Sequence, residues 1–349
     1  MSGRPRMSER ENIPDVVAGA SGASGARVAR AASIGRGVPV LAFDVGGTDI
    51  KSALFDGDGT ALGLNRTPTP SGGEDPARAL VDRLAVLAGE LRDQHPGVVP
   101  EAVGLVVPGI VDADGGVAVF SSNLGWRNAP LRDLMAQRFG LPVAFDHDVR
   151  AGSWAERVLG GARDYADAVV LIIGTGIAGT LLVGGRPYTA GGYAGEIGHS
   201  PIGEWPCPCG ARGCLEAVAS AGAIARRYTE ATGAAVAGAH DVLVLARAGN
   251  EIAMRIWNDA LDALTLSIAQ LTAVLAPQAV VIGGGLSRAG DALFEQLRLR
   301  LADRLSFHRI PALVPAELSG DAGILGSALL AREAAGGEAR EAARGEERA

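Results

Sequence analysis

Residues 40–60, VLAFDVGGTDIKSALFDGDGT, carry the pattern from which the fold can be predicted. An apolar run, a Gly-Gly-Thr turn and a second apolar run predict two strands joined by a tight reversal. Glycines adopt positive φ and let a ligand approach the backbone, so this turn suits a phosphate group as well as a plain hairpin. The residues of interest in the turn are Asp44, Gly46, Gly47 and Thr48.

Further strands and helices alternate along the rest of the chain. Apolar runs predict strands over 102–109, 142–147, 168–174, 177–185 and 279–285. Helical spacing of apolar residues predicts helices over 75–94, 149–161, 290–305 and 322–333. Strands that alternate with helices in this way indicate an α/β fold. We therefore expect two α/β lobes with a cleft between them, where small-molecule sites tend to lie.

The boundaries of these lobes follow from composition. We expect an N-terminal lobe over 38–147 and a C-terminal lobe over 148–321, with a last helix over 322–335 that packs back on the first lobe. Residues 1–37 and 336–349 contain few large apolar side chains and cannot bury enough surface to offset their ordering entropy. Both segments are therefore expected to be disordered tails.

Composition and charge limit the classes of partner. A chain of 349 residues that is 48% apolar and 20% charged fits a globular protein of about two domains. A net charge of −7 argues against a nucleic-acid partner, which usually requires a basic surface. No apolar stretch reaches the roughly 18 residues of a membrane helix, and no signal-peptide core is present. Three clustered cysteines do not make a disulfide framework, so we expect a cytoplasmic protein.

Two more glycine turns repeat the form of the first. One lies between two predicted strands and the other between a strand and a helix; their residues are Gly174, Thr175 and Gly176, and Gly283, Gly284 and Gly285. Neither is a Walker A loop or a dinucleotide fingerprint. Backbone amides at strand ends and helix starts attract phosphate groups, so three such turns in one chain favour ATP binding.

One carboxylate stands where a phosphoryl-transfer enzyme needs a proton acceptor. Asp148, in the segment VAFDHDVRAGSW, ends a predicted strand and begins a predicted helix. A carboxylate within reach of the acceptor hydroxyl can deprotonate it during phosphoryl transfer. Aspartate is also among the best helix caps, which is the alternative interpretation of this position. Asp146 is the second candidate.

Residues 195–216, GEIGHSPIGEWPCPCGARGCLE, contain all three cysteines of the chain. The residues that could bind a metal are His199, Cys207, Cys209 and Cys214. They provide the ligand types of a structural Cys₃His zinc site. Inert buried cysteines are a poorer interpretation, because Pro208 and two glycines keep the thiols in a loop. Two carboxylates, Glu196 and Glu216, bracket this loop.

Taken together, the segments DVGGTDIKSAL, LIIGTGIAGT, GEIGHSPIG and CPCGARGCLE resemble the ROK family of sugar kinases and sugar-responsive repressors. The resemblance covers residues 38–335. The histidine followed by cysteines is its specific part, whereas the glycine turns are shared by the wider group of actin-like ATPases. It implies a two-lobed, actin-like (ribonuclease H-like) α/β fold, an ATP–Mg²⁺ site in the cleft and a hexose as phosphate acceptor.

The resemblance also implies a role for each matching residue. Asp148 matches the catalytic base that takes the proton from the sugar 6-hydroxyl. The implied sugar contacts are Asn123, His147, Asp148, Glu196, His199 and Glu216. The implied nucleotide contacts are Asp44 near Mg²⁺, Gly46, Gly47 and Thr48 at the first turn, Gly174, Thr175 and Gly176 at the second, and Gly283, Gly284 and Gly285 on the adenosine side. Zinc on His199, Cys207, Cys209 and Cys214 would be structural and would position the glutamates.

The chain departs from the family beside the expected base. Family kinases usually read Asn-Asp-Ala-Asn there, and this chain has His147, Asp148, Val149 and Arg150. A neutral imidazole at His147 can still donate and accept a hydrogen bond, but an imidazolium only donates, so sugar affinity should depend on pH. Arg150 is expected to place a cation near Asp148 and to lower the pKa of that carboxylate.

The sequence thus predicts an ATP-dependent hexose kinase that forms a sugar 6-phosphate. Glucose is the first candidate, and N-acetylglucosamine or N-acetylmannosamine is the second. A non-catalytic sugar sensor is a further alternative, as is a repressor-type protein without its DNA-binding domain, because residues 1–37 lack a helix-turn-helix pattern. Polyphosphate in place of ATP, and a homodimer or a homotetramer, all remain open.

Overall fold

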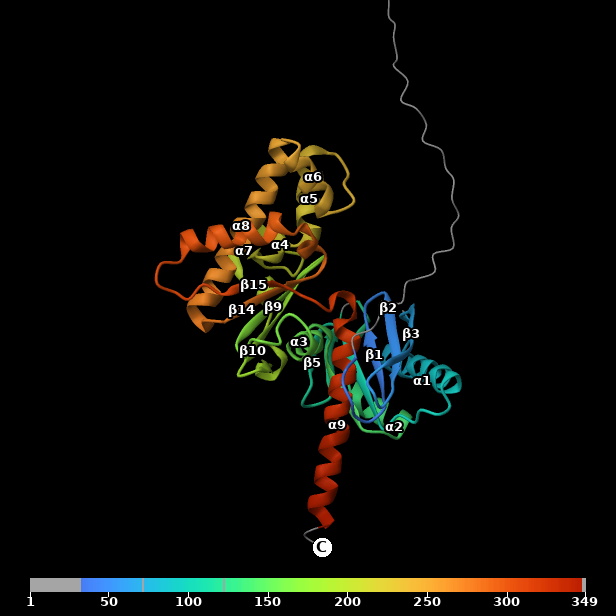
Figure 1. Cartoon of the computed structure of the whole chain (residues 1–349). Coiled ribbons are helices and arrows are strands. Elements are labelled where there is room, and N and C mark those ends of the chain that lie inside the picture. Colours follow the sequence, from blue (N-terminus) through green and yellow to red (C-terminus); the bar gives the residue numbers. More distant parts are fainter. Residues whose placement is uncertain (1–32, 71, 122, 347–349) are drawn as a thin grey trace, which may run out of the picture. The chain divides into compact units, whose positions relative to one another are not determined.

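Two five-stranded sheets form the centre of the protein (Figure 1). The computed structural model describes residues 33–70, 72–121 and 123–346. The first sheet has the order β3-β2-β1-β4-β8. Its strands are β1 (Val40–Val45), β2 (Asp49–Phe55), β3 (Ala61–Pro68), β4 (Ala102–Val107) and β8 (Val143–His147). Strand β1 runs antiparallel to β2 and parallel to β4, so the expected reversal after β1 is present.

Helices cover both faces of the first sheet. Helix α1 (Pro76–Gln94) begins after the N-cap Asp75 and packs Leu80, Leu84, Leu87 and Leu91 into the same core as Leu41 and Phe43 of β1. Helix α2 (Leu131–Phe139) adds Leu131 and Met135 to that core. Successive residues of a strand face opposite sides. Val40 and Ala42 accordingly pack on the other face, against Ile324 and Ala328 of α9 (Ala322–Glu346).

The second sheet has the order β11-β10-β9-β14-β15. Its strands are β9 (Ala168–Ile173), β10 (Ile177–Val183), β11 (Arg186–Tyr188), β14 (Ala279–Gly283) and β15 (Ala312–Pro315). The largest hydrophobic core of this half lies between the sheet and a group of helices. The longest of these helices is α7 (Glu251–Leu275), and the others are α4 (Glu216–Ala219), α5 (Ala221–Thr232), α6 (Ala239–Arg247) and α8 (Asp291–Arg304). Helix α3 (Asp148–Leu159) follows β8 and leads to β9.

Two small sheets shape the loops. Strands β5 (Ile110–Asp112), β6 (Val117–Ser121) and β7 (Trp126–Ala129) form a three-stranded sheet after β4. Strands β12 (Pro201–Pro206) and β13 (Arg212–Cys214) form a hairpin around the cysteine-rich loop. The turns η1 (Ala190–Gly192) and η2 (Ile197–His199) connect β11 to this hairpin.

Helices α3 and α9 approach closely because small residues line their contact. A Cβ added to Gly326 would lie 2.0 Å from the carbonyl oxygen of Ala151, and one added to Gly152 would lie 3.3 Å from the Cβ of Ala322. No side chain fits at Gly326 without moving a backbone. The start of α9 also reaches β1, where a Cβ on Gly323 would lie 2.6 Å from the Asp44 carboxylate. This contact brings the helix N-terminus to the first glycine turn.

The ordered part of the chain is longer than the sequence predicts. Ile34, expected in the N-terminal tail, is buried, and its amide donates to the Gly59 carbonyl at 3.1 Å. Helix α9 continues to Glu346 instead of ending at 335, because alanine, glutamate and arginine are good helix formers. Residues 1–32 and 347–349 of the expected tails lie outside the described residues.

Two smaller points concern the third turn and the membrane. Glycines 283–285 do not lead straight into a long helix, because the short turn η3 (Gly285–Ala289) precedes α8. Among the described residues, no helix combines the length and apolar character that a bilayer-spanning helix needs.

Candidate functional site

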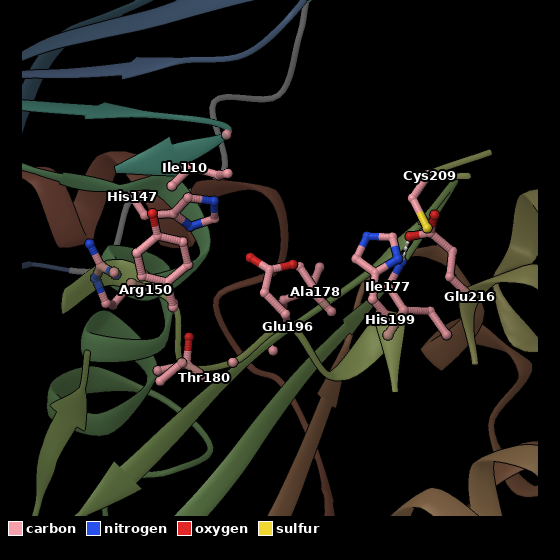
Figure 2. A pocket seen from close by; sticks show the side chains of 18 of the residues that line it. Ile110, His147, Arg150, Ile177, Ala178, Thr180, Glu196, His199, Cys209 and Glu216 are labelled. Carbon is pink, nitrogen blue, oxygen red and sulfur yellow. Dashed lines mark hydrogen bonds between the residues drawn. The ribbon is translucent and has the colours of Figure 1, made fainter. Parts of the chain in front are cut away.

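A cavity of about 1080 Å³ collects most of the expected sugar contacts (Figure 2). Its lining includes Asn123, His147, Glu196, His199 and Glu216, together with Gly174 and Gly176 of the second turn. It also includes three partly exposed aromatic side chains, Phe120, Tyr188 and Tyr193. Aromatic rings with a few convergent polar groups are a common lining of small-molecule sites.

The expected base lies beside this cavity but is not among its lining residues. Asp148 is the first residue of α3, and its side chain is 27% exposed. The Val149 amide donates to Asp148 Oδ1 at 2.7 Å, which fixes the carboxylate at the helix start. The N-cap of this helix is His147, so Asp148 is held by the amide of the next residue and not by an N-cap bond, and it keeps an oxygen that can accept a proton.

The imidazole of His147 has two neighbours, one a hydrogen-bond acceptor and the other a hydrogen-bond donor. Its Nδ1 lies 3.2 Å from Asp148 Oδ1, which needs a donor, and 3.2 Å from the Val149 amide, which needs an acceptor. The Val149 amide already has a shorter bond to the Asp148 carboxylate. We therefore assign the Nδ1 proton to the bond with Asp148, and the Nε2 of a neutral ring becomes an acceptor.

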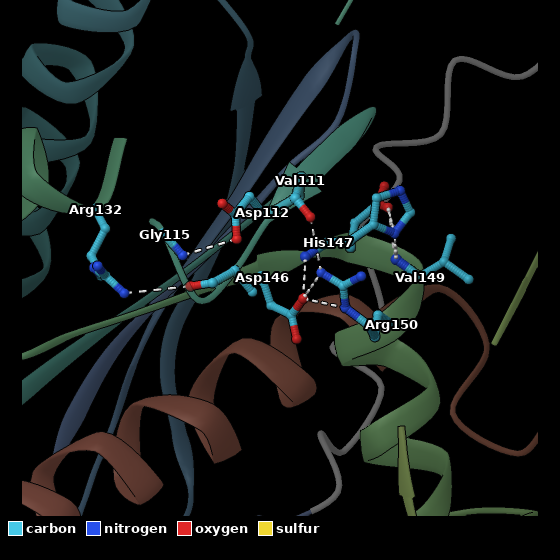
Figure 3. Close-up of polar contacts among 10 residues, drawn as sticks. Val111, Asp112, Gly115, Arg132, Asp146, His147, Val149 and Arg150 are labelled. Carbon is cyan, nitrogen blue, oxygen red and sulfur yellow. Dashed lines mark hydrogen bonds and ion pairs between the residues drawn. The ribbon is translucent and has the colours of Figure 1, made fainter. Parts of the chain in front are cut away.

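Arg150 pairs with Asp146, the residue two positions before the expected base (Figure 3). Its Nε donates to Asp146 Oδ1 at 2.5 Å, and its Nη2 lies 3.5 Å from the Val111 carbonyl. The guanidinium is buried and its charge is paired with Asp146.

The first glycine turn is held by its own sheet. The Gly46 amide donates to the Asp49 carbonyl at 2.8 Å. Thr69, just after β3, donates through its amide to Thr48 and through its hydroxyl to Gly46, both at 2.8 Å. A Cβ on Gly47 would lie 3.5 Å from the Asn123 side chain, so Asn123 connects this turn with the cavity.

Asp44 is a buried carboxylate with one cationic partner. Lys51 donates to Asp44 Oδ2 at 2.8 Å and to the Gly320 carbonyl at 2.5 Å. Burial raises the pKa of the Asp44 carboxyl, the Lys51 ammonium opposes that rise, and the negative charge of Asp148 adds to it.

The second and third turns are neighbours. The Gly174 amide donates to the Gly176 carbonyl at 2.9 Å, which closes the second turn. Gly284 has a φ of 80°, and a Cβ there would lie 2.4 Å from the carbonyl oxygen of Ile173, directly before the second turn. Only glycine satisfies both conditions. The structure therefore brings these two expected nucleotide contacts together.

The four expected metal ligands converge. The candidate ligand atoms of His199, Cys207, Cys209 and Cys214 all lie within 4.8 Å of one another. The sulfur atoms of Cys209 and Cys214 are 3.7 Å apart, and Cys207 Sγ lies 3.9 Å from His199 Nδ1. Zinc–sulfur bonds of about 2.3 Å at tetrahedral angles place two sulfurs about 3.8 Å apart. The donor set and its spacing fit a tetrahedral zinc ion.

Burial and neighbouring groups shift the pKa values of Cys209 and Cys214. The pKa of Cys214 is raised to about 12 by burial and by hydrogen bonds with Cys207 and Cys209. The pKa of Cys209 is lowered, mainly by a hydrogen bond with the backbone at Ala211. A metal ion binds thiolates and would therefore displace the Cys214 proton.

One contact of Glu216 was missed by the sequence reasoning. Glu216 Oε2 accepts a hydrogen bond from the Ile177 amide at 2.7 Å, directly after the second turn. The two residues are 39 positions apart. No local pattern could have indicated this bond, because it depends on how the segment that carries the four candidate ligands, residues 199–214 (the metal loop), packs against β10.

Comparisons with known proteins agree with this architecture. The model of the ROK family matches residues 40–334. A glucokinase from Thermotoga maritima is 35% identical over 320 residues, which cover 85% of this chain and 98% of that protein. An N-acetylmannosamine kinase from Escherichia coli is 35% identical over 302 residues, which cover 84% of this chain and 98% of that protein.

A solved structure gives the same result for the fold. The ROK family glucokinase from Streptomyces griseus, in complex with glucose and AMPPNP, has a TM-score of 0.68 at 28% identity. The match covers 84% of this chain and 99% of that chain. The chain therefore belongs to the ROK family and has its two-lobed, actin-like ATPase fold.

Proposed function

We propose that this protein is an ATP-dependent hexose kinase that phosphorylates the sugar 6-hydroxyl. The observation that carries the proposal is a single cavity lined by His147, Glu196, His199 and Glu216 and by the second glycine turn, with Asp148 beside it. Two glucokinases support the same reaction: the one from Thermotoga maritima is 35% identical, and the one from Streptomyces griseus, solved with glucose and AMPPNP, is 28% identical.

The reaction assigns a separate task to each group. Asp148 accepts the proton of the 6-hydroxyl while that oxygen bonds to the γ-phosphorus of ATP, and the bond between that phosphorus and the ADP oxygen breaks. The three glycine turns bind the nucleotide through backbone amides. Asp44 offers the carboxylate oxygen that Mg²⁺ prefers, and its burial beside the first turn fits that use. Mg²⁺, when bound, neutralises charge on the phosphates.

The Cys₃His cluster would hold zinc as a structural ion. Its four protein ligands leave no position for a reacting water. His199 and Cys209 also line the cavity, so the ion would fix the orientation of groups beside the sugar. In this arrangement Asn123, His147, Glu196, His199 and Glu216 bind sugar hydroxyls.

Glucose is the first candidate substrate. An N-acetylhexosamine is the second, favoured by an N-acetylmannosamine kinase at the same 35% identity. We place the enzyme in the cytoplasm, where ATP is available and thiols stay reduced. We expect it to be a homodimer or a homotetramer.

An ADP-release assay over a sugar panel tests the proposal. Glucose, mannose, N-acetylglucosamine and N-acetylmannosamine are each offered with Mg²⁺ and either ATP or polyphosphate. We expect turnover with ATP and at least one of these sugars, and the product is checked for a 6-phosphate. Sugar binding without turnover under any condition would instead identify a sensor.

A further inference from the structure

The carboxylate of Glu216 rests on the second glycine turn. Its Oε2 accepts from the amide of Ile177, the first residue of β10, at 2.7 Å. A Cβ added to Gly176 would lie 2.4 Å from the same oxygen. The carboxylate therefore occupies the space that a side chain at Gly176 would need. No second hydrogen bond to this carboxylate is present among the described residues, so Oε1 can accept from a sugar hydroxyl.

The opposite flank of the metal loop contacts the same residue. Gly198 precedes the metal ligand His199, and a Cβ on Gly198 would lie 2.1 Å from the carbonyl oxygen of Ile177. The amide of Ile177 is thus hydrogen-bonded from the Cys214 side of the loop, and its carbonyl is packed closely against Gly198 on the His199 side. A shift of either flank would disturb these contacts at the start of β10.

The chain beyond Glu216 covers the rest of the turn. The Ala221 amide, at the start of α5, donates to the Gly174 carbonyl at 2.9 Å. A Cβ on Gly222 would lie 2.6 Å from the Thr175 carbonyl oxygen. Every residue of the second turn therefore contacts the segment that follows the last metal ligand.

From these contacts we infer that Glu216 is a positioning residue for the nucleotide site, through which the metal loop sets the geometry of the second glycine turn. The inference rests on the proposed kinase function. One oxygen of Glu216 holds the turn while the other is free to bind the sugar, so one carboxylate links the two substrates. Coupling of this kind is reciprocal: sugar strengthens nucleotide binding by the factor by which nucleotide strengthens sugar binding.

Nucleotide affinity without sugar is the direct test. Calorimetry measures binding of the Mg²⁺ complex of AMPPNP to the full-length holoprotein and to three variants. Glu216→Ala should weaken binding by about 10-fold, since it removes a charge-assisted hydrogen bond to the turn. Glu216→Gln should restore most of the affinity, because its amide oxygen can still accept from the Ile177 amide. Glu204→Ala is the matched control, because Glu204 lies in the same hairpin, on β12, but is exposed and outside the cavity lining, so this variant should bind nucleotide as the wild type does.

The same titrations with saturating sugar measure the coupling. Wild-type affinity for the nucleotide should rise several-fold with sugar, and Glu216→Ala should lose that rise. Zinc content and melting temperature identify a variant that has lost its fold. The chelated wild type offers a second route, because it keeps Glu216 but should also bind nucleotide more weakly.

Three results would overturn the inference. Glu216→Ala could bind nucleotide as tightly as the wild type, Glu216→Gln could be as weak as the alanine variant, or the chelated protein could keep full affinity. Failure of the wild type itself to bind nucleotide would be a different outcome, since it would remove the proposed function as well.

Discussion

The first and second glycine turns share a sequence form but are held by different parts of the molecule. The first is closed by Asp49 and by Thr69, both in or next to its own antiparallel strands. The second is held by Glu216 and Gly198, which flank the metal loop. Both turns therefore lie between paired strands, but only the second also contacts the segments that flank the candidate metal ligands.

This difference teaches that the two sides of the site can be perturbed separately. The first side contains the buried pair of Asp44 and Lys51, with Asp148 close enough to affect the pKa of Asp44. The second side contains the metal cluster and the Ile177 amide. Changes on the first side should alter the turnover rate and the pH dependence of stability. Changes on the second side should alter how rigidly the second glycine turn is held.

The largest expected effect is on the first side. Asp148→Asn keeps the size of the side chain but removes the proton acceptor, so turnover should fall by about 10²- to 10⁴-fold with little change in sugar or nucleotide affinity. Asp291→Asn is the matched control, because Asp291 is likewise the first residue of its helix, α8. Steady-state kinetics and calorimetry measure both. Near wild-type turnover in Asp148→Asn would move the catalytic role to Asp146.

The second prediction concerns removal of the metal. Chelation, or Cys209→Ala, should remove about one zinc ion per chain and release the flanks that hold Ile177. Hydrogen exchange at the Ile177 amide should then accelerate by about 10-fold or more, because its acceptor Glu216 is no longer fixed. The Gly46 amide, bonded to Asp49, should exchange as before.

Exchange mass spectrometry on the holoprotein and the chelated protein measures both segments in one experiment, and added zinc should reverse the change. Equal acceleration at both turns would mean that the metal stabilises the whole fold and not the second turn in particular. No change at either turn would mean that the loop keeps its shape without an ion.

The sequence was most informative where strands are buried on both faces. All six residues of β4 are buried, as are those of β1, so β4 appears as an unbroken apolar run and β1 as one interrupted only by Asp44. Strand β3 has no fully buried residue, and β5 and β7 have three and four residues, so none of them leaves a periodic pattern. The missed strands are the short or half-buried ones.

The same limit explains what could be predicted of the site. The ligand types of the metal cluster lie within one loop, so their spacing was informative. The sequence analysis considered Arg150 only as a cation near Asp148 and did not predict its ion pair with Asp146. The bond between Glu216 and Ile177 joins two distant segments and is visible only in three dimensions.

A third prediction tests the ion pair under the first turn. The side chains of Lys51 and Asp44 are 18% and 12% exposed, so Lys51→Met would leave a buried carboxylate without its cation. The free energy of unfolding at neutral pH should fall by about 1–3 kcal/mol. Arg138→Met is the control: its pair with Asp82 is exposed, and its loss should cost about 0–1 kcal/mol.

The pH dependence of the Lys51→Met effect has a definite sign. Burial raises the pKa of Asp44 in the folded protein above its value in the unfolded chain. As pH falls through that raised pKa, the folded state takes up the proton first and is stabilised relative to the unfolded state. The loss caused by Lys51→Met should therefore be largest at neutral pH and should shrink on acidification. Denaturant unfolding at several pH values measures it, and a pH-independent loss would contradict a charge effect.

The smallest expected effect belongs to His147, which stands between the base and the cavity. His147→Asn should not lower the stability of α3, since asparagine is among the best helix caps. The amide is shorter than the imidazole, so its reach into the cavity differs. We expect KM for the sugar to change by about 2- to 10-fold, with a smaller change in kcat. Steady-state kinetics measure both proteins, and identical KM and kcat values would show that His147 does not contact the sugar. A change confined to kcat would instead mean that His147 acts through its bond to Asp148, and would place it on the chemical side of the site.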